Sequence, residues 1–153
     1  MKVDYIDPFV RSARSTLEQL SGSAATAGPP SLLGTTFATS PVNIVCRVSG
    51  SLEGEAVYSM STLTARELAT LIAGTEPNTF GQVMGRSLAQ LASTWAEAAR
   101  HMLGEMGFDC RISCPIVFQG LNVEFDVDAP ALAVGIETEA GRVEVSVAVK
   151  DGR

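Results

Sequence analysis

The chain is poor in the residues that most often build metal centres and reactive sites. Its 153 residues include three cysteines and one histidine. Cys46, Cys110 and Cys114 are odd in number and lack zinc-ligand spacing, and His101 has no thiol or carboxylate cluster near it in the sequence. The sequence therefore predicts no metal site and no cofactor. We expect the cysteines to be reduced and mostly buried.

Two short motifs, one of thiols and one of carboxylates, also fall short of a site. Cys110 and Cys114 would lie on the same side of a strand, where two small buried side chains are a more common arrangement than a redox pair. Asp126 and Asp128 are expected in a small acidic turn, but two carboxylates fall short of the ligand set of a calcium loop. His101 suits a position near the C-terminal end of a helix.

Long apolar runs and an excess of basic residues are missing as well. Apolar stretches are only a few residues long, and Asp4 stands where a signal peptide needs basic residues. The net charge of −6 would repel the phosphates of a nucleic acid. We expect a cytoplasmic protein that binds neither membranes nor nucleic acid. Charged residues make up 18% of the chain, against roughly 25% in ordinary domains, which indicates surface covered by a protein partner.

The hydrophobic content of 46% is enough for one domain with a real core over residues 1–153. Asp7 and Pro8 are predicted as the N-cap and first residue of a helix that ends at Gly22. Its apolar stripe comprises Ile6, Phe9, Val10, Ala13, Leu17 and Leu20. Residues 21–34, rich in Ser, Ala, Gly and Pro, are predicted to be a loop.

The middle of the chain predicts a hairpin followed by two helices. Strands over 44–48 and 56–60 are joined by the turn-rich residues 50–54. A capping box from Thr64 to Glu67 opens a short helix that carries Leu68, Leu71 and Ile72 and ends at Gly74. A long helix follows over 79–103, ended by Gly104 and Gly107; its buried seam comprises Met84, Leu88, Leu91, Trp95, Ala98 and Met102.

The last third of the chain predicts strands. Residues 121–127 alternate apolar and polar side chains, and strands over 131–138 and 143–149 are joined by a turn at 139–141. The 143–149 strand is regular and carries little charge, which would suit a free sheet edge for dimer formation. The order of elements predicts an α/β (α+β) domain, in which an antiparallel sheet packs against a long helix and shorter helices.

The sequence resembles CheX proteins of bacterial chemotaxis in segments spread along nearly the whole chain. The first is the opening segment, in which an extended lead enters the first helix through Asp7-Pro8. The others are Val48-Ser49-Gly50, residues 54–60, Leu71-Ile72-Ala73-Gly74, Gly107-Phe108-Asp109, Ile112-Ser113, Pro115 and Gly120. This resemblance implies the single-domain CheC/CheX-like fold, a homodimer and a CheY-like response regulator as partner.

The same resemblance implies a phosphatase signature, Glu-x-x-Asn, on the long helix. In CheX and CheC the carboxylate meets a lysine of the regulator, and the amide orients the water that attacks the aspartyl-phosphate. Counted back from Gly107-Phe108-Asp109, the two signature positions fall on Gln90 and Ser93. Both signature residues are replaced, and Glu-x-x-Asn occurs nowhere in the chain.

Helical spacing places the signature positions in a polar stripe that faces away from the apolar seam. This stripe comprises Arg86, Gln90, Ser93, Glu97 and Arg100. It is expected to be exposed, and the resemblance makes it the docking face for a regulator. Without the resemblance, an ordinary solvated helix face would be the simplest interpretation.

Three functions remain open from the sequence. The preferred one is a CheX-type signalling module that docks on a CheY-like regulator with little or no phosphatase activity. The second is an active phosphatase in which Gln90 positions the water and Glu97 supplies the missing charge. The third is a structural subunit of a signalling or flagellar-switch assembly.

Overall fold

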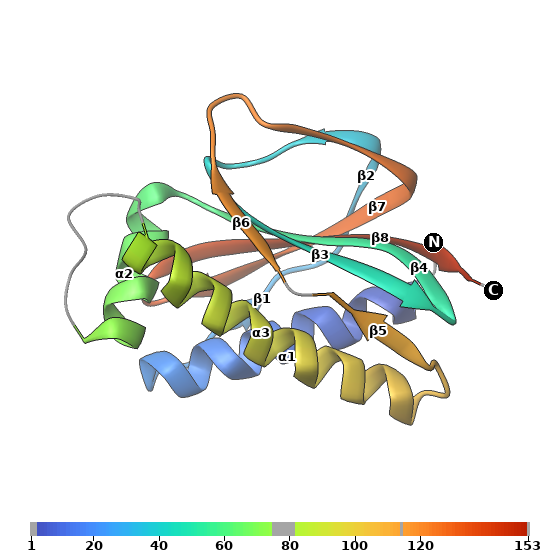
Figure 1. Cartoon of the computed structure of the whole chain (residues 1–153), viewed down its shortest axis with the longest axis horizontal. Helices are drawn as coiled ribbons and strands as arrows, with labels where there is room; N and C mark the ends of the chain where they lie inside the picture. The colour runs from blue at the N-terminus through green and yellow to red at the C-terminus, as the bar shows by residue number, and fades with distance from the viewer. Residues whose placement is uncertain (1–2, 75–81, 114, 153) are drawn as a thin grey trace.

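The computed structural model describes residues 3–74, 82–113 and 115–152. Within them, three helices cover one face of an eight-stranded antiparallel sheet (Figure 1). The helices are α1 (Val3–Ser21), α2 (Thr62–Ala73) and α3 (Gln82–Glu105). The strands are β1 (Thr26–Ala27), β2 (Ser31–Ala38), β3 (Val42–Gly50), β4 (Leu52–Met60), β5 (Cys110–Ile112), β6 (Ile116–Gln119), β7 (Glu124–Thr138) and β8 (Gly141–Asp151). The predicted fold class is confirmed. None of the described helices is long and apolar enough to span a membrane.

The centre of the sheet is made by β8 and β4. The strand order is β1-β7-β8-β4-β3-β5, with β2 also beside β7 and β6 also beside β3. Val143, Val145, Val147 and Val149 all face the buried side, as their alternation predicts. The expectation that 143–149 forms a free edge is wrong, because β8 is hydrogen-bonded to β7 on one side and β4 on the other. Alternation reports one buried face, and it does not distinguish a central strand from an edge strand.

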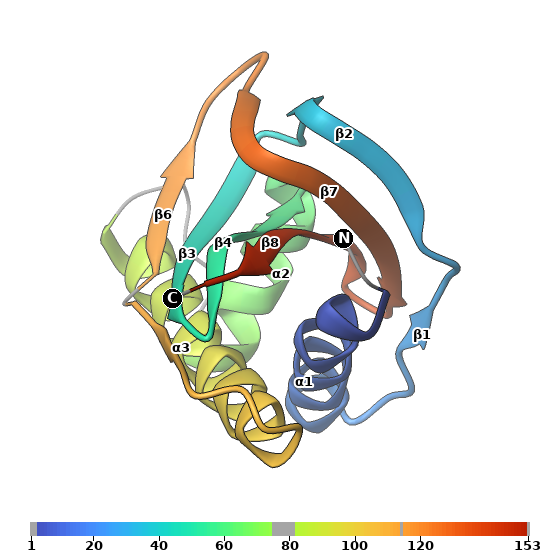
Figure 2. The same ribbon diagram turned by 90° about the vertical axis from the view of Figure 1, so that its right-hand side faces the viewer.

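The main core lies between the sheet and the helix pair α1 and α3. These two helices run side by side beneath the sheet (Figures 1 and 2). Tyr5, near the start of α1, makes an edge contact with Phe108 just after α3, at 5.3 Å between ring centroids. The Tyr5 hydroxyl also donates to Asp151 Oδ1 at 2.7 Å, which links the first helix to the last strand.

A second, smaller core lies on the opposite face of the sheet. There, β2 and the first half of β7 bend over the sheet, and β6 rises toward them (Figure 2). Phe125 contacts Phe37 at 5.7 Å and Phe118 at 6.2 Å between ring centroids, so aromatic rings join β2, β7 and β6. Phe37 is itself buried, in one cluster with Val57, Ala131 and Ala148. The sheet is therefore half closed into a barrel.

Several element boundaries differ from the predicted ones. α1 begins at Val3, so Asp7 and Pro8 lie inside it, in its second turn instead of at its cap. The apolar stripe explains the earlier start, because Tyr5 and Ile6 are buried on the same face as Phe9. The predicted loop over 21–34 contains β1 and the start of β2, since both pair with β7.

The N-cap of α2 and the start of the strand after β6 also differ from their predicted positions. Ser61, three residues before Thr64, is the N-cap of α2: its hydroxyl accepts from the Thr64 N–H at 3.1 Å. Leu71 on α2 is 46% exposed. Asp126 and Asp128 lie in β7 and not in a turn, and Leu121 is 85% exposed ahead of that strand.

Other local predictions are confirmed. Strands β3 and β4 form the expected hairpin, with longer strands and a shorter turn. Gly22, Gly74 and Gly107 adopt positive φ at the ends of the three helices, although α3 continues through Gly104 to Glu105. The predicted helix start at Thr79 lies outside the described residues.

Gly54 gives a test of how closely β4 and β8 approach. A Cβ on Gly54 would lie 1.9 Å from the Ala148 carbonyl oxygen, at φ +150°, whereas a Cβ on Gly22, at φ +74°, would meet nothing within 4 Å. Gly22→Ala should cost about 1 kcal/mol for its left-handed backbone alone, and Gly54→Ala at least about 3 kcal/mol. Urea unfolding followed by fluorescence of Trp95, the only tryptophan of the sequence, measures both. Equal losses in the two variants would contradict this close approach.

Candidate functional site

The outward face of α3 is the candidate site. Its inward side buries the predicted seam residues Met84, Leu88, Leu91 and Trp95 against the sheet and neighbouring helices. The predicted stripe lies opposite the seam, and each of its members is exposed: Arg86, Gln90, Ser93, Glu97 and Arg100. Residues 87–96, between the charged ends of the stripe, carry no charge. The predicted exposure is confirmed, and the roles of these residues stay predictions.

Gln90 and Ser93 open onto different hollows on the two sides of α3. Gln90 lines a groove between the three helices, together with Thr16, Gln19, Leu20, Leu71, Ile72, Leu91 and Thr94. Ser93 lines a shallow hollow toward β5 and β6, together with Ala96, Glu97, Arg100, Ile112, Ser113 and Pro115. The two side chains therefore do not converge on one small-molecule pocket. They form a convex ridge, which is suited to contact with a protein surface.

Glu97 and Arg100 form an ion pair at the far end of the stripe. Arg100 Nε donates to the two carboxylate oxygens at 3.2 and 3.1 Å, and Arg100 Nη2 donates to Oε1 at 2.5 Å. These hydrogen bonds lower the pKa of Glu97 and raise the pKa of Arg100. Both side chains are well exposed, so the pair contributes little to stability. Its consequence is chemical, because the Glu97 carboxylate already has a cationic partner.

Glu97 is also far from Gln90 along the helix. Seven residues separate them, which corresponds to about 10 Å of rise along the axis. A lysine of the partner that contacts the Glu97 carboxylate would therefore lie about 10 Å along the helix axis from a water held at the Gln90 amide. The geometry does not bring the two groups of the second hypothesis together.

The cysteines and His101 form no site among the described residues. Cys46 and Cys110 are both buried and free. Cys110 pairs with Gly50 across β3 and β5, four residues along β3 from Cys46. Burial raises the pKa of the Cys46 thiol to about 12, so this thiol stays protonated and unreactive near neutral pH. Cys114 lies outside the described residues. His101 is exposed, with Nε2 3.9 Å from Glu105 Oε2.

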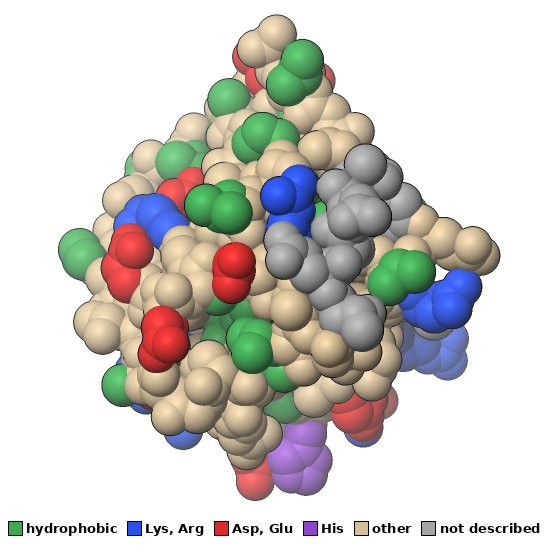
Figure 3. Space-filling view, turned by 90° about the vertical axis from the view of Figure 1, so that its left-hand side faces the viewer, with side chains coloured by type: hydrophobic (Ala, Val, Ile, Leu, Met, Phe, Trp, Pro, Cys, Tyr) green, Lys and Arg blue, Asp and Glu red, His purple; other side chains and the backbone are tan. Residues whose placement is uncertain are grey.

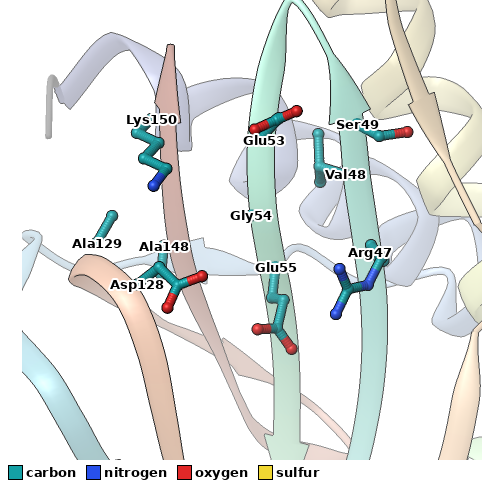
Figure 4. A pocket seen from close by; sticks show the side chains of 10 residues that line it. All are labelled: Arg47, Val48, Ser49, Glu53, Gly54, Glu55, Asp128, Ala129, Ala148 and Lys150. Carbon is teal, nitrogen blue, oxygen red and sulfur yellow. The ribbon is translucent and has the colours of Figure 1, made fainter. Parts of the chain in front are cut away.

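A second hollow on the opposite face of the sheet was not predicted from the sequence. Its charged lining residues come from four strands: Arg47, Glu53, Glu55, Asp128 and Lys150 (Figure 4). Arg47 is directly opposite Glu55 in the β3 and β4 pairing, and Glu53 is directly opposite Lys150 in the β4 and β8 pairing. Opposite charges on adjacent strands offset one another, so the hollow does not favour a ligand of one charge. No three His, Cys, Asp or Glu side chains of the described chain gather where they could hold a metal ion.

Comparison with known proteins identifies the fold. No family model matches the sequence, and no curated protein matches it. Among solved structures, CheX from Desulfovibrio desulfuricans matches with a TM-score of 0.86 and 18% identity, over 97% of this chain and 100% of that chain. A CheC-like superfamily protein from Shewanella sp. PV-4 matches with a TM-score of 0.85 and 18% identity, over 98% and 99% of the two chains.

A third match comes from a complex. A chain of the CheX–CheY–BeF3–Mg²⁺ complex from Borrelia burgdorferi matches with a TM-score of 0.78 and 23% identity, over 98% of this chain and 100% of that chain. The protein therefore has the fold of the CheX and CheC-like chemotaxis proteins over essentially its whole length.

The ion pair on the stripe predicts a measurable titration shift. In Arg100→Gln, the pKa of Glu97 should rise toward its ordinary value of about 4.3, because the hydrogen bonds from Arg100 are the largest cause of its lowering. Carboxyl-carbon NMR titration measures this pKa. Arg142→Gln is the matched control, since Arg142 pairs with Glu137 and Glu144 on β7 and β8. The same Glu97 titration in both variants would contradict the assigned pair.

Proposed function

We propose that the chain is a cytoplasmic CheX-type signalling module that docks on a CheY-like response regulator through the outward face of α3, with little or no phosphatase activity. One observation carries this proposal. In a chain with the fold of CheX proteins, the two positions to which the sequence resemblance assigns the signature carboxylate and amide hold Gln90 and Ser93, and both are exposed. The complex of CheX with CheY from Borrelia burgdorferi supports a regulator as the partner.

Hydrolysis of an aspartyl-phosphate depends on positioning a water and stabilising charge. Gln90 carries no charge, so the bond from a carboxylate to the regulator's lysine, worth roughly 1.5–3 kcal/mol, is missing. Ser93 carries a hydroxyl instead of an amide, and its side chain is too short to reach far into a partner's active site. Glu97 does not replace the acid, because Arg100 already holds its carboxylate. The docking face is retained while each catalytic group is absent.

The first alternative is an active phosphatase in which the Gln90 amide positions the water. Gln90 is exposed on the proposed docking face, which favours this alternative over any that uses a buried residue. The Gln90 side chain is one methylene longer than Asn, and it lies one helical turn from the position of the signature Asn. A displacement of about 1 Å costs on the order of a hundredfold in rate, so such an enzyme should be slow.

Restoring the signature tests the proposal. Gln90→Glu with Ser93→Asn places Glu-x-x-Asn on an exposed helix face, where the substitutions should change stability by no more than about 0.5 kcal/mol. The double variant should accelerate decay of a phosphorylated CheY-like regulator, and the unmodified protein should not. Phosphate release from the regulator alone, with each protein, and with Gln90→Ala measures this directly.

Binding of the same regulator accompanies the rate measurement. Fast decay with the unmodified protein that is lost in Gln90→Ala would establish the alternative phosphatase. Absence of binding to every CheY-like regulator of the same bacterium would overturn the docking proposal.

A homodimer belongs to the same proposal, formed through β2. This strand has no partner on its outer side among the described residues, and no charged residue occurs between Glu18 and Arg47. Leu32 on β2 is 72% exposed. Long uncharged edges favour pairing with another strand, and a charge on the edge opposes it. The edge that supports dimer formation is therefore β2 and not β8.

Light scattering at tens of micromolar should give the mass of a dimer. Leu32→Lys should shift the protein toward monomer, whereas Leu63→Lys, which charges an equally exposed leucine on α2, should not. A monomer for the unmodified protein, or a dimer unaffected by Leu32→Lys, would contradict an interface at this edge.

A further inference from the structure

The groove between the three helices is an uncharged concavity beside Gln90, and its lining is informative. Leu20, Ile72 and Leu91 form its apolar floor, from α1, α2 and α3 respectively. Thr16, Gln19, Gln90 and Thr94 form a rim of hydroxyls and amides. Leu71 completes the lining. None of the eight lining residues carries a charge.

Leu71 is the exceptional member of this lining. It lies in the last turn of α2, a helix capped at both ends by Ser61 and Gly74, and its helix neighbours Leu68 and Ala69 are buried. Leu71 itself is 46% exposed. A half-exposed leucine beside an apolar floor presents surface that a partner side chain can bury, at about 25 cal/mol for each Å² removed from water. Leu63, which is 65% exposed on the same helix, lines none of the hollows described above.

The surroundings of the groove indicate the chemistry of its occupant. Gln90, the signature position, forms one wall, so the groove is continuous with the proposed docking face. Arg86 lies one turn before Gln90 on that face, exposed and with no ion pair among the described residues. Figure 3, which faces the α2 end of the molecule, shows separate apolar side chains exposed among polar and charged ones. The occupant should therefore present an apolar side chain next to an acidic one.

We propose that an apolar side chain on the docking surface of a CheY-like regulator inserts into this groove and packs on Leu71 and Ile72, with an acidic residue of the regulator beside Arg86. This inference rests on the proposed function and adds the contact that gives affinity. A side chain seated in the groove would place the regulator directly over the ridge of Gln90 and Ser93. Leu71 is then a specificity-determining residue that touches the partner.

The test uses exposed leucines on one helix. Binding of a purified CheY-like regulator in its Mg²⁺–BeF3 form is measured calorimetrically with the unmodified protein, Leu71→Ser and Leu63→Ser. Leu71→Ser should weaken binding about tenfold or more, as truncation of a buried interface anchor does. Leu63→Ser, which alters a more exposed leucine of the same helix outside the groove, should change it less than twofold. Trp95 fluorescence checks that both variants are folded.

Substitution of arginines tests whether an acidic residue of the regulator lies beside Arg86. Arg86→Gln should weaken binding about threefold and reduce its dependence on salt, because it removes a charge pair across the interface. Arg47→Gln, which removes an exposed arginine from the opposite face of the sheet, should have neither effect.

The outcomes separate this inference from the proposed function. Regulator binding that is equal for the unmodified protein, Leu71→Ser and Leu63→Ser would overturn the groove and leave docking on α3 intact. Failure of the unmodified protein to bind any CheY-like regulator of its bacterium would overturn the proposed function, and the groove inference with it.

Discussion

The contact between Trp95 and Tyr58 fixes α3 on the sheet, and the geometry of the candidate site depends on it. The two rings are 4.6 Å apart between centroids, both are fully buried, and they join the middle of α3 to β4 near its C-terminal end. Truncating a buried aromatic residue of this size typically costs about 3–5 kcal/mol, a large part of the stability of a small domain. Because Trp95 can face only the sheet, the rotation of α3 about its axis is set. Gln90 and Ser93 must then face outward.

The same constraint determines what surrounds the signature positions. α1 packs along one side of α3, and α2 meets them both near the start of α3. Their meeting creates the uncharged groove beside Gln90, while β5 and β6 border the hollow beside Ser93. The ridge between these concavities belongs to a helix that is buried along its other side. The proposed docking face therefore lies on a helix whose position the core fixes, which lowers the entropic cost of forming an interface there.

Sequence patterns predicted those elements whose residues carry a strong periodicity or a clear turn signal. The β3 and β4 hairpin and the buried seam of α3 are examples, and the seam spacing alone predicted that the stripe from Arg86 to Arg100 would be exposed. The edge strands were missed because residues 21–34 combine turn-forming glycine and proline with short strands, which only pairing with β7 reveals. The Glu97 and Arg100 pair was available from its i, i+3 spacing. The groove could not be predicted from the sequence, because it depends on how three helices come together. The exposure of Leu71 could not be predicted either, because apolar spacing on a helix favours burial.

Docking and hydrolysis place different demands on the same surface, which is why a chain can keep one and lack the other. Docking depends on shape, apolar area and charge summed over many side chains, so a change from Glu to Gln or from Asn to Ser at one position alters it little. Hydrolysis depends on single atoms placed within about 1 Å and on a carboxylate whose charge no neutral group supplies. In this protein the nearest carboxylate on the face, Glu97, lies two turns from Gln90 and is held by Arg100. The proposed docking face therefore lacks the carboxylate and the amide that hydrolysis needs, which is why we propose binding without turnover.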